Sequence, residues 1–146
     1  MPEKLSPRMF YVASSRDRLE DVIRVSAALE RSGMTNAFSW PDHFSHKCSV
    51  SQCGIADRTA LAHRELAAAA ACSLFVGIHR MGKGAHVELG AALLGSSLRL
   101  PMGAPAGRVI LVGVDCTDLV FYETRRVEHV ADIAGLFSLL GLFAEA

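Results

Sequence analysis

The segment 73–94, SLFVGIHRMGKGAHVELGAALL, constrains the fold most, because it joins an apolar run, a glycine-containing loop and a helical pattern. Ser73–Ile78 has the length of a buried strand, and the spacing of apolar residues predicts a helix from about Ala85 to Leu98. Strand, loop and helix in this order form a βα unit, and open α/β folds bind ligands at the carboxyl ends of their strands. Glu88 lies about one turn into the helix, so we expect it to face such a site, with the helix N-terminus keeping its carboxylate ionised.

The remaining chain repeats this alternation. Further strands are expected at Arg8–Ser14, Ala37–Trp40, Arg108–Val114 and Val127–Val130, and further helices at Arg16–Gly33, Asp57–Cys72 and from an Asp132 cap onwards. The central strands are continuously apolar, which is typical of parallel sheets covered on both faces. The pattern predicts an α/β fold, a three-layer sandwich around a doubly wound, five-stranded parallel sheet of the flavodoxin or Rossmann-like kind. We expect a single domain over residues 1–146.

Charge and hydropathy limit the classes of binding partner and the location that we expect. The 15 basic residues balance the 15 acidic ones, so no electrostatic attraction to nucleic acid or an anionic membrane is expected. The polar start Met1–Pro7 does not have the pattern of a signal peptide, and the longest apolar run, Leu66–Ile78, is too short to span a bilayer. We therefore expect a cytoplasmic protein with reduced cysteines.

One cluster has the residue types of a metal site. Cys48 and Cys53 follow His43 and His46 within Asp42–Ile55, a polar segment whose length favours a lid over a site. No second pair with ligand spacing is present, so we expect neither a metal nor a cofactor. Walker, G-x-G-x-x-G and G-x-S-x-G motifs are also absent from the sequence.

What remains is a lone carboxylate beside a glycine loop. An ionised glutamate there can attack, or electrostatically stabilise, a sugar carbon of oxocarbenium character, as in retaining glycosidases. The alternative is a glutamate that makes only favourable dipole contacts at the start of a helix. His86, two positions before Glu88, does not share its helix face, and we interpret it as an orienting or a structural residue.

The segments FYVASS, SLFVG, GKGAHVELGAAL, VILVG and LVFY together resemble the nucleoside 2-deoxyribosyltransferase family and its nucleotide N-glycosidase relatives. The similarity runs roughly from Met9 to Phe143. Its most specific part is the pattern G-x-x-x-E-[LI]-G, which Gly84, Glu88, Leu89 and Gly90 match. The resemblance implies that Glu88 is the nucleophile that takes a deoxyribosyl group from a purine or pyrimidine.

The resemblance also implies a tyrosine that orients the nucleophile and an acid that protonates the base. Tyr11 matches the tyrosine, although an ordinary strand residue is the alternative. Family members usually carry an Asp six residues before the nucleophile, where this chain has Gly82, and another in the helix before the third strand. The nearest candidates for the second acid are Glu65 and Asp57, and Asp42 is a further one. The proton donor stays open, as does the choice between transfer to a second base and transfer to water.

The nucleotide hydrolases of this superfamily hold a 5′-phosphate, and several groups of this chain are candidates to do so. The candidate substrate-binding residues are Ser14, Ser15, Gly82, Lys83, Gly84, His86, Ser96 and Ser97, with a solvated loop lysine as the alternative for Lys83. A non-catalytic module that binds a nucleotide derivative is the alternative function.

The resemblance finally implies a homodimer or a higher homo-oligomer in which a neighbouring subunit completes the site. Asp118 and Tyr122 are candidates to project into a partner's pocket, with plain surface residues as the alternative. The alanine-rich helix and Ala91–Leu94 are candidates for the contact between subunits. The expected ligand is a nucleoside or nucleotide.

Overall fold

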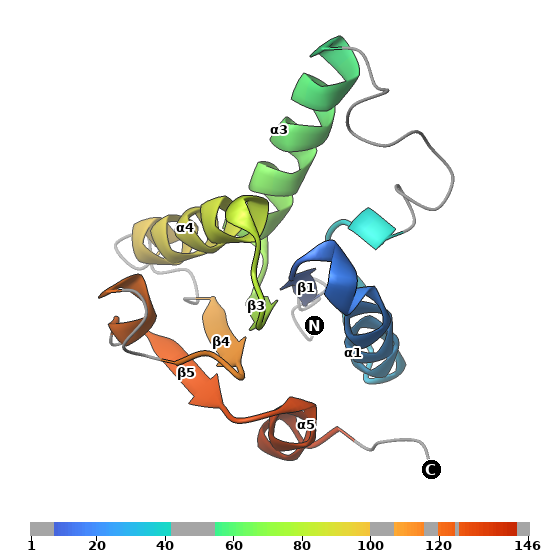
Figure 1. The fold of residues 1–146 in the computed structure, drawn as a ribbon, viewed down its shortest axis with the longest axis vertical. Coiled ribbons are helices and arrows are strands. Elements are labelled where there is room, and N and C mark those ends of the chain that lie inside the picture. Colours follow the sequence, from blue (N-terminus) through green and yellow to red (C-terminus); the bar gives the residue numbers. More distant parts are fainter. Residues whose placement is uncertain (1–7, 42–54, 100–106, 116–119, 125, 143–146) are drawn as a thin grey trace, which may run out of the picture.

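The computed structural model describes residues 8–41, 55–99, 107–115, 120–124 and 126–142. Five strands form one all-parallel sheet in the order β2-β1-β3-β4-β5 (Figure 1). The strands are β1 (Met9–Ala13), β2 (Thr35–Asn36), β3 (Leu74–Ile78), β4 (Arg108–Val112) and β5 (Val127–Val130). The predicted doubly wound parallel sheet is confirmed.

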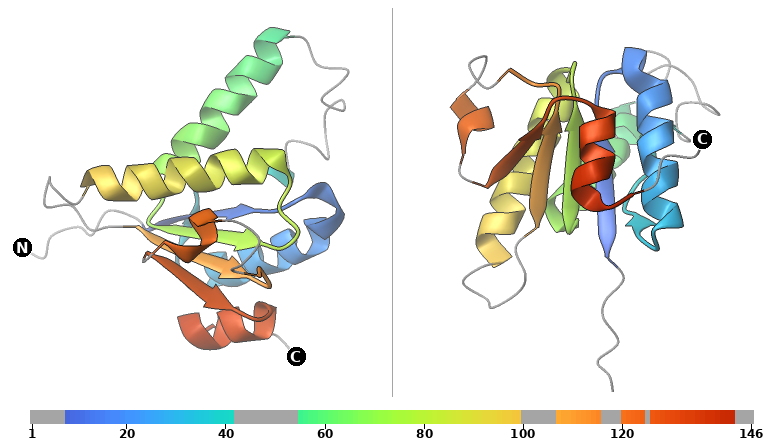
Figure 2. Two further views of the ribbon diagram at one scale, coloured as in Figure 1. Left: turned by 60° about the vertical axis from the view of Figure 1, so that its left-hand side comes forward. Right: turned by 90° about the horizontal axis from the view of Figure 1, so that it is seen from below.

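Helices cover both faces of this sheet, with α1 and α5 on one face and α3 and α4 on the other (Figure 2). The helices are α1 (Leu19–Arg31), α3 (Ile55–Ala71), α4 (Lys83–Arg99) and α5 (Ile133–Leu140), with 3₁₀ turns η1 (Arg16–Arg18) and η3 (Val120–Glu123). The three-layer α/β sandwich is thus confirmed. None of the helices described is long and apolar enough to cross a membrane.

Several element ends follow the predicted local signals. The C-terminal end of α1 is followed by Gly33, whose φ of 97° lies in the left-handed region that glycine adopts at no steric cost. The Asp132 side chain accepts a hydrogen bond from the Gly135 amide at 2.8 Å and caps α5 as expected. The fifth strand occupies the predicted Val127–Val130.

The second strand is where the prediction from sequence was wrong. Strand pairing covers Thr35–Asn36 and not Ala37–Trp40. The Ala37 amide still donates to the Phe10 carbonyl at 2.8 Å, and the Asn36 side-chain oxygen then accepts a hydrogen bond from the Phe38 amide at 3.2 Å in a local turn. The Trp40 indole instead packs into the core and donates to the Val12 carbonyl at 2.9 Å.

Close packing of α3 on α4 sets the position of the two helices over the sheet. A Cβ atom placed on Gly95 of α4 would lie 2.2 Å from the carbonyl oxygen of Ala70 on α3, so only glycine permits this approach. The alanines around this contact, including buried Ala68 and Ala69, present a smooth surface to the neighbouring helix. Each of these helices carries one acidic residue of the candidate site.

Candidate active site

The candidate site lies where β1 and β3 end side by side. In the order β2-β1-β3-β4-β5 the connections diverge between β1 and β3, and at such a switch point open α/β sheets have their ligand crevice. Ala13, the last residue of β1, pairs with Gly77 in β3. The connections that follow these two strands carry the predicted Ser14, Ser15 and Gly82.

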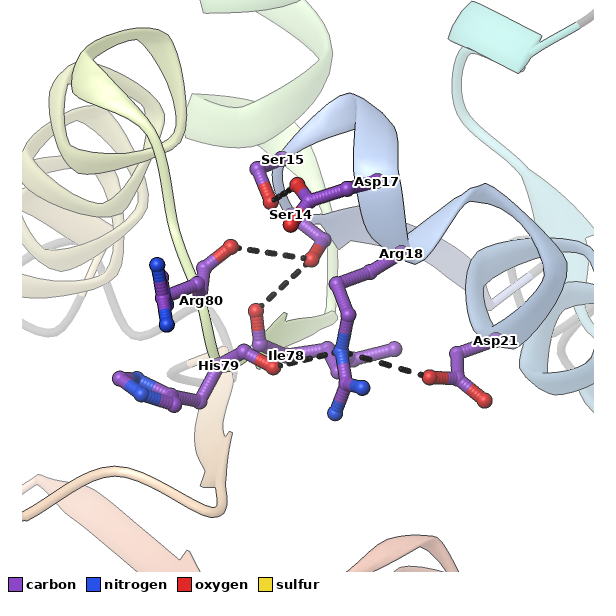
Figure 3. A network of polar contacts seen from close by, with 8 residues as sticks. All are labelled: Ser14, Ser15, Asp17, Arg18, Asp21, Ile78, His79 and Arg80. Carbon is purple, nitrogen blue, oxygen red and sulfur yellow. Dashed lines mark hydrogen bonds and ion pairs between the residues drawn. The ribbon is translucent and has the colours of Figure 1, made fainter.

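The connections after β1 and β3 are tied to each other by a polar network (Figure 3). Ser14 Oγ donates to the Ile78 carbonyl at 2.8 Å, and the Ser15 amide donates to the Arg80 carbonyl at 3.0 Å. Arg18 Nε lies 2.9 Å from the His79 carbonyl oxygen and 3.4 Å from an Asp21 carboxylate oxygen. Arg18 could not be predicted from the sequence, because its partner is a backbone carbonyl distant in the chain and leaves no residue pattern.

This network engages the hydroxyl groups of the two serines that were predicted to bind substrate. Ser15 Oγ donates to the Asp17 carboxylate, and this hydrogen bond is the main reason that the pKa of Asp17 lies below its ordinary value. The Ser14 hydroxyl proton is likewise engaged within the chain. Ser14 and Ser15 therefore lie at the candidate site, but an anionic ligand would have to displace these bonds to receive either proton.

Glu88 projects from the second turn of α4 into the protein interior. Its side chain is 9% exposed, and burial raises its pKa to about 7, with the negative charge of Glu65 acting in the same direction. In the described part of the chain no cation forms an ion pair with Glu88. Burial thus opposes the ionisation of Glu88 that the position near the helix N-terminus favours.

Tyr11 of β1 faces Glu88 from the sheet. Its ring is fully buried and stacks on Phe75, with centroids 6.0 Å apart and planes 9° from parallel. Burial raises the pKa of Tyr11, and the charges of Glu88 and Glu65 raise it further. The hydroxyl also lowers the pKa of Glu88 by interacting with its carboxylate, although it makes no hydrogen bond of ordinary geometry to a described residue. We interpret this as a close approach of the Tyr11 hydroxyl to the Glu88 carboxylate. Hydrogen bonds in active sites are often long in a free enzyme and shorten when substrate binds.

Glu65 of α3 is the third member of the group. It is half-buried, and desolvation raises the pKa of its carboxyl group. Its charge acts on both Glu88 and Tyr11, so the structure brings together three residues predicted from different segments. The other two candidate acids, Asp42 and the side chain of Asp57, lie outside the described residues, as do Asp118 and the four residues of the rejected zinc site.

His86 is joined to Tyr122 across the structure. Its Nδ1 atom lies 2.9 Å from the Gly82 carbonyl oxygen, and its Nε2 atom is hydrogen-bonded to the Tyr122 hydroxyl. Tyr122 is 6% exposed and contacts its own chain, so the prediction that it projects into a partner's pocket was wrong. The reason is that η3 turns the side chain inward, against α4.

The start of α4 also differs from the prediction. Lys83 and Gly84 belong to the first turn of the helix and not to a preceding loop, and both are exposed. Ser96 is buried and donates to the Gly107 carbonyl at 3.0 Å. At 1.5 Å per residue it lies about 20 Å along α4 from Lys83. Ser96 and Ser97 therefore cannot bind the same phosphate as the amides of Gly82–Ala85, which corrects that expectation.

Within the described ranges, no group of three or more His, Cys, Asp or Glu side chains is arranged to hold a metal ion. The chemistry available is that of two carboxyl groups with raised pKa values and a phenol, all partly or fully shielded from water. In a pair of carboxyl groups of this kind, one can act as an acid while the other is an anion.

Comparison with solved structures shows a likeness to a known fold. The structure of Clostridium botulinum CMP N-glycosidase, BcmB, matches with a TM-score of 0.56 and 12% sequence identity, over 92% of this chain and 98% of that chain. No protein-family model matches the sequence, and no curated protein matches it. At this identity the likeness concerns the fold.

Proposed function

We propose that this protein cleaves the N-glycosidic bond of a nucleoside or a nucleoside 5′-monophosphate, with Glu88 as the nucleophile. The observation that carries the proposal is the buried Glu88 carboxyl group, which lies at the switch point of the sheet beside Glu65 and the Tyr11 hydroxyl. The fold likeness to a CMP N-glycosidase supports it.

In the proposed reaction the Glu88 carboxylate attacks the anomeric carbon as the bond to the base nitrogen breaks. Glu65 gives its proton to the departing base, and the sugar is left as an ester on Glu88. A water molecule, or a second base, then attacks the same carbon while Glu65 takes up a proton, and Glu88 is released as the carboxylate. Tyr11 orients Glu88 through its hydroxyl.

Burial of both groups favours a single proton on the pair. The charge of Glu65 raises the pKa of Glu88, so in the free protein that proton lies on Glu88, and the proposed reaction requires its transfer to Glu65 when substrate binds. Gly82 occupies the place of the Asp that the related transferases use, which is why Glu65 is assigned the proton transfer.

Chromatography of free bases released from a panel of nucleosides and their 5′-monophosphates tests the proposal. We expect release by the wild type, and a loss of at least about 10³-fold in kcat for Glu88→Gln, since the amide cannot act as the nucleophile. Glu128→Gln, an exposed change on β5, serves as the matched control and should leave turnover unchanged. Preference for monophosphates would identify a nucleotide hydrolase, and free-base exchange would identify a transferase.

The alternative is a non-catalytic module that binds a nucleotide derivative. It is supported if a ligand binds the wild type and Glu88→Gln equally, measured by calorimetry, and neither releases the base. That result would contradict the proposed enzyme.

We further propose that the protein forms a homodimer or higher homo-oligomer. In support, α4 carries three outward-facing apolar side chains, Val87, Leu94 and Leu98, each 59–61% exposed. With Ala91 they repeat at the four- and three-residue spacing of a helix–helix seam. Light scattering after size exclusion should give more than one chain per particle, and Leu94→Glu should reduce the mass. A monomeric wild type would contradict the proposal.

A further inference from the structure

The first turn of α4 precedes Glu88, and in it Ala85 is buried in the core whereas residues 82–84 contribute little side-chain packing. A Cβ atom at Gly84 would meet nothing within 4 Å, and one at Gly82 would meet only Ser15 Cβ, at 4.0 Å. Lys83 is exposed between them. Besides the packing of Ala85, hydrogen bonds to the Gly82 carbonyl hold this turn, one of them from the His86 amide at 3.2 Å.

The principal side-chain bond there comes from His86. A carbonyl oxygen can only accept, so the 2.9 Å contact between His86 Nδ1 and Gly82 O requires the proton on Nδ1. In the neutral ring Nε2 is then an acceptor, and the Tyr122 hydroxyl is its donor. The tautomer of His86 is thus fixed by Tyr122, because the hydrogen bond at one ring nitrogen of a histidine determines whether the other nitrogen carries the proton.

Tyr122 is itself held firmly. Its ring is 6% exposed and lies 5.8 Å from the imidazole, with 28° between the planes. Its backbone carbonyl accepts a hydrogen bond from His129 Nε2 at 2.6 Å, which joins η3 to β5. The hydroxyl that reaches His86 is therefore anchored to the sheet.

We propose that Tyr122 is a positioning residue for Glu88. By donating to His86 Nε2 it holds the Nδ1–H tautomer, which binds Gly82 O and fixes the turn that sets the position of the Glu88 carboxylate. A nucleophile has to be held to within about 0.5 Å of its productive position, and supporting hydrogen bonds add to packing in holding it there. This inference rests on the proposed function in which Glu88 is the nucleophile.

A double-mutant cycle tests the connection. Tyr122→Phe keeps the ring and its burial and removes only the hydroxyl, and we expect kcat to fall about 10- to 100-fold with KM within about threefold. His86→Asn keeps a donor near Gly82 O but lacks the acceptor for Tyr122. In that background Tyr122→Phe should cause no further loss. Phe121→Ala, an exposed neighbour in η3, is the matched control and should keep wild-type kcat. Additive losses, or an unchanged kcat in Tyr122→Phe, would overturn the proposal.

Amide hydrogen exchange provides a measurement that does not depend on turnover. Tyr122→Phe should speed exchange in the first turns of α4, residues 83–88, and leave β1 and β3 protected as in the wild type. Phe121→Ala should change neither. If exchange in this turn is unaltered, the inference fails even where base release is observed. If the turn loosens but the wild type releases no base, the anchor is supported and the failure belongs to the proposed function.

Discussion

The carboxylate of Glu65 on α3 raises the pKa of Glu88 on α4, so the two helices that pack most closely in this fold bring two like charges together. Such an arrangement costs stability and is found where carboxyl groups are needed in different protonation states. It is the electrostatic basis of the proposed proton transfer.

Removing the charge of Glu65 should lower the pKa of Glu88. In Glu65→Gln the repulsion is gone but burial remains, so we expect a value below about 7 and still above the ordinary 4.5. NMR titration of the Glu88 side-chain carboxyl carbon measures it. Glu128→Gln, which alters a charge paired with Arg108 away from the site, should leave the titration of Glu88 unchanged. A pKa that stays the same or rises in Glu65→Gln would contradict the coupling.

Tyr11→Phe should move the same pKa in the other direction. The hydroxyl of Tyr11 lowers the pKa of Glu88, so its loss should raise it and displace the acid limb of the kcat/KM profile for base release to higher pH. The stacking on Phe75 is kept, and the hydroxyl is buried without an ordinary hydrogen bond to a described residue, so thermal stability should not fall. An acid limb that is unchanged or moves to lower pH would argue against the contact.

The local features of the fold could be predicted from the sequence because they depend on neighbouring residues. The strand–helix unit around Glu88, the Gly33 end of α1 and the Asp132 cap each follow from a short pattern. The strand at residues 37–40 could not be placed correctly, because the Phe38 amide donates to the Asn36 side-chain oxygen and forms a local turn there.

The candidate site could be predicted only in part, for a related reason. Tyr11 and Glu88 lie on a strand and a helix that local sequence patterns predict. The proximity of Glu65 depends on how α3 packs on α4, and Gly95 permits their close approach without any periodicity that encodes it. The contact between His86 and Tyr122 joins side chains distant in sequence, and nothing in either segment points to the other.

Burial of Glu88 should make the protein less stable as the pH rises. Its pKa is about 7 in the folded protein and about 4.5 in the unfolded chain, so the folded state binds the extra proton between these values. The free energy of unfolding should fall as the pH rises through this window, by about 3 kcal/mol in total, since one pKa unit corresponds to about 1.4 kcal/mol.

Glu88→Gln is neutral at all these pH values and should not lose this stability. Urea unfolding should therefore give similar stabilities for both proteins near pH 4.5 and a more stable Glu88→Gln at pH 8. Glu128→Gln is a control in which the change of stability at high pH has the opposite sign. In the wild type, hydrogen bonds from Arg108 lower the pKa of Glu128, so their loss in this variant destabilises the protein above pH 4.5. Equal pH dependence in the wild type and Glu88→Gln would mean that Glu88 is not buried in this way.

The spacing between α3 and α4 should be intolerant of a single methyl group. In Gly95→Ala the new Cβ would lie 2.2 Å from the Ala70 carbonyl oxygen, which is backbone and cannot move aside without shifting a helix. We expect a loss of about 1–3 kcal/mol in the free energy of unfolding, the usual range for overpacking, together with reduced base release as Glu65 moves relative to Glu88.

Gly90→Ala in the same helix is the matched control, because a Cβ there would meet nothing within 4 Å. Alanine is the better helix former, so this variant should gain up to about 1 kcal/mol and keep its turnover. Urea unfolding of both variants, with base release measured on the same preparations, separates the two effects. If Gly95→Ala were as stable as Gly90→Ala, the helices would not approach as closely as the fold requires, and the pairing of Glu65 with Glu88 would need another explanation.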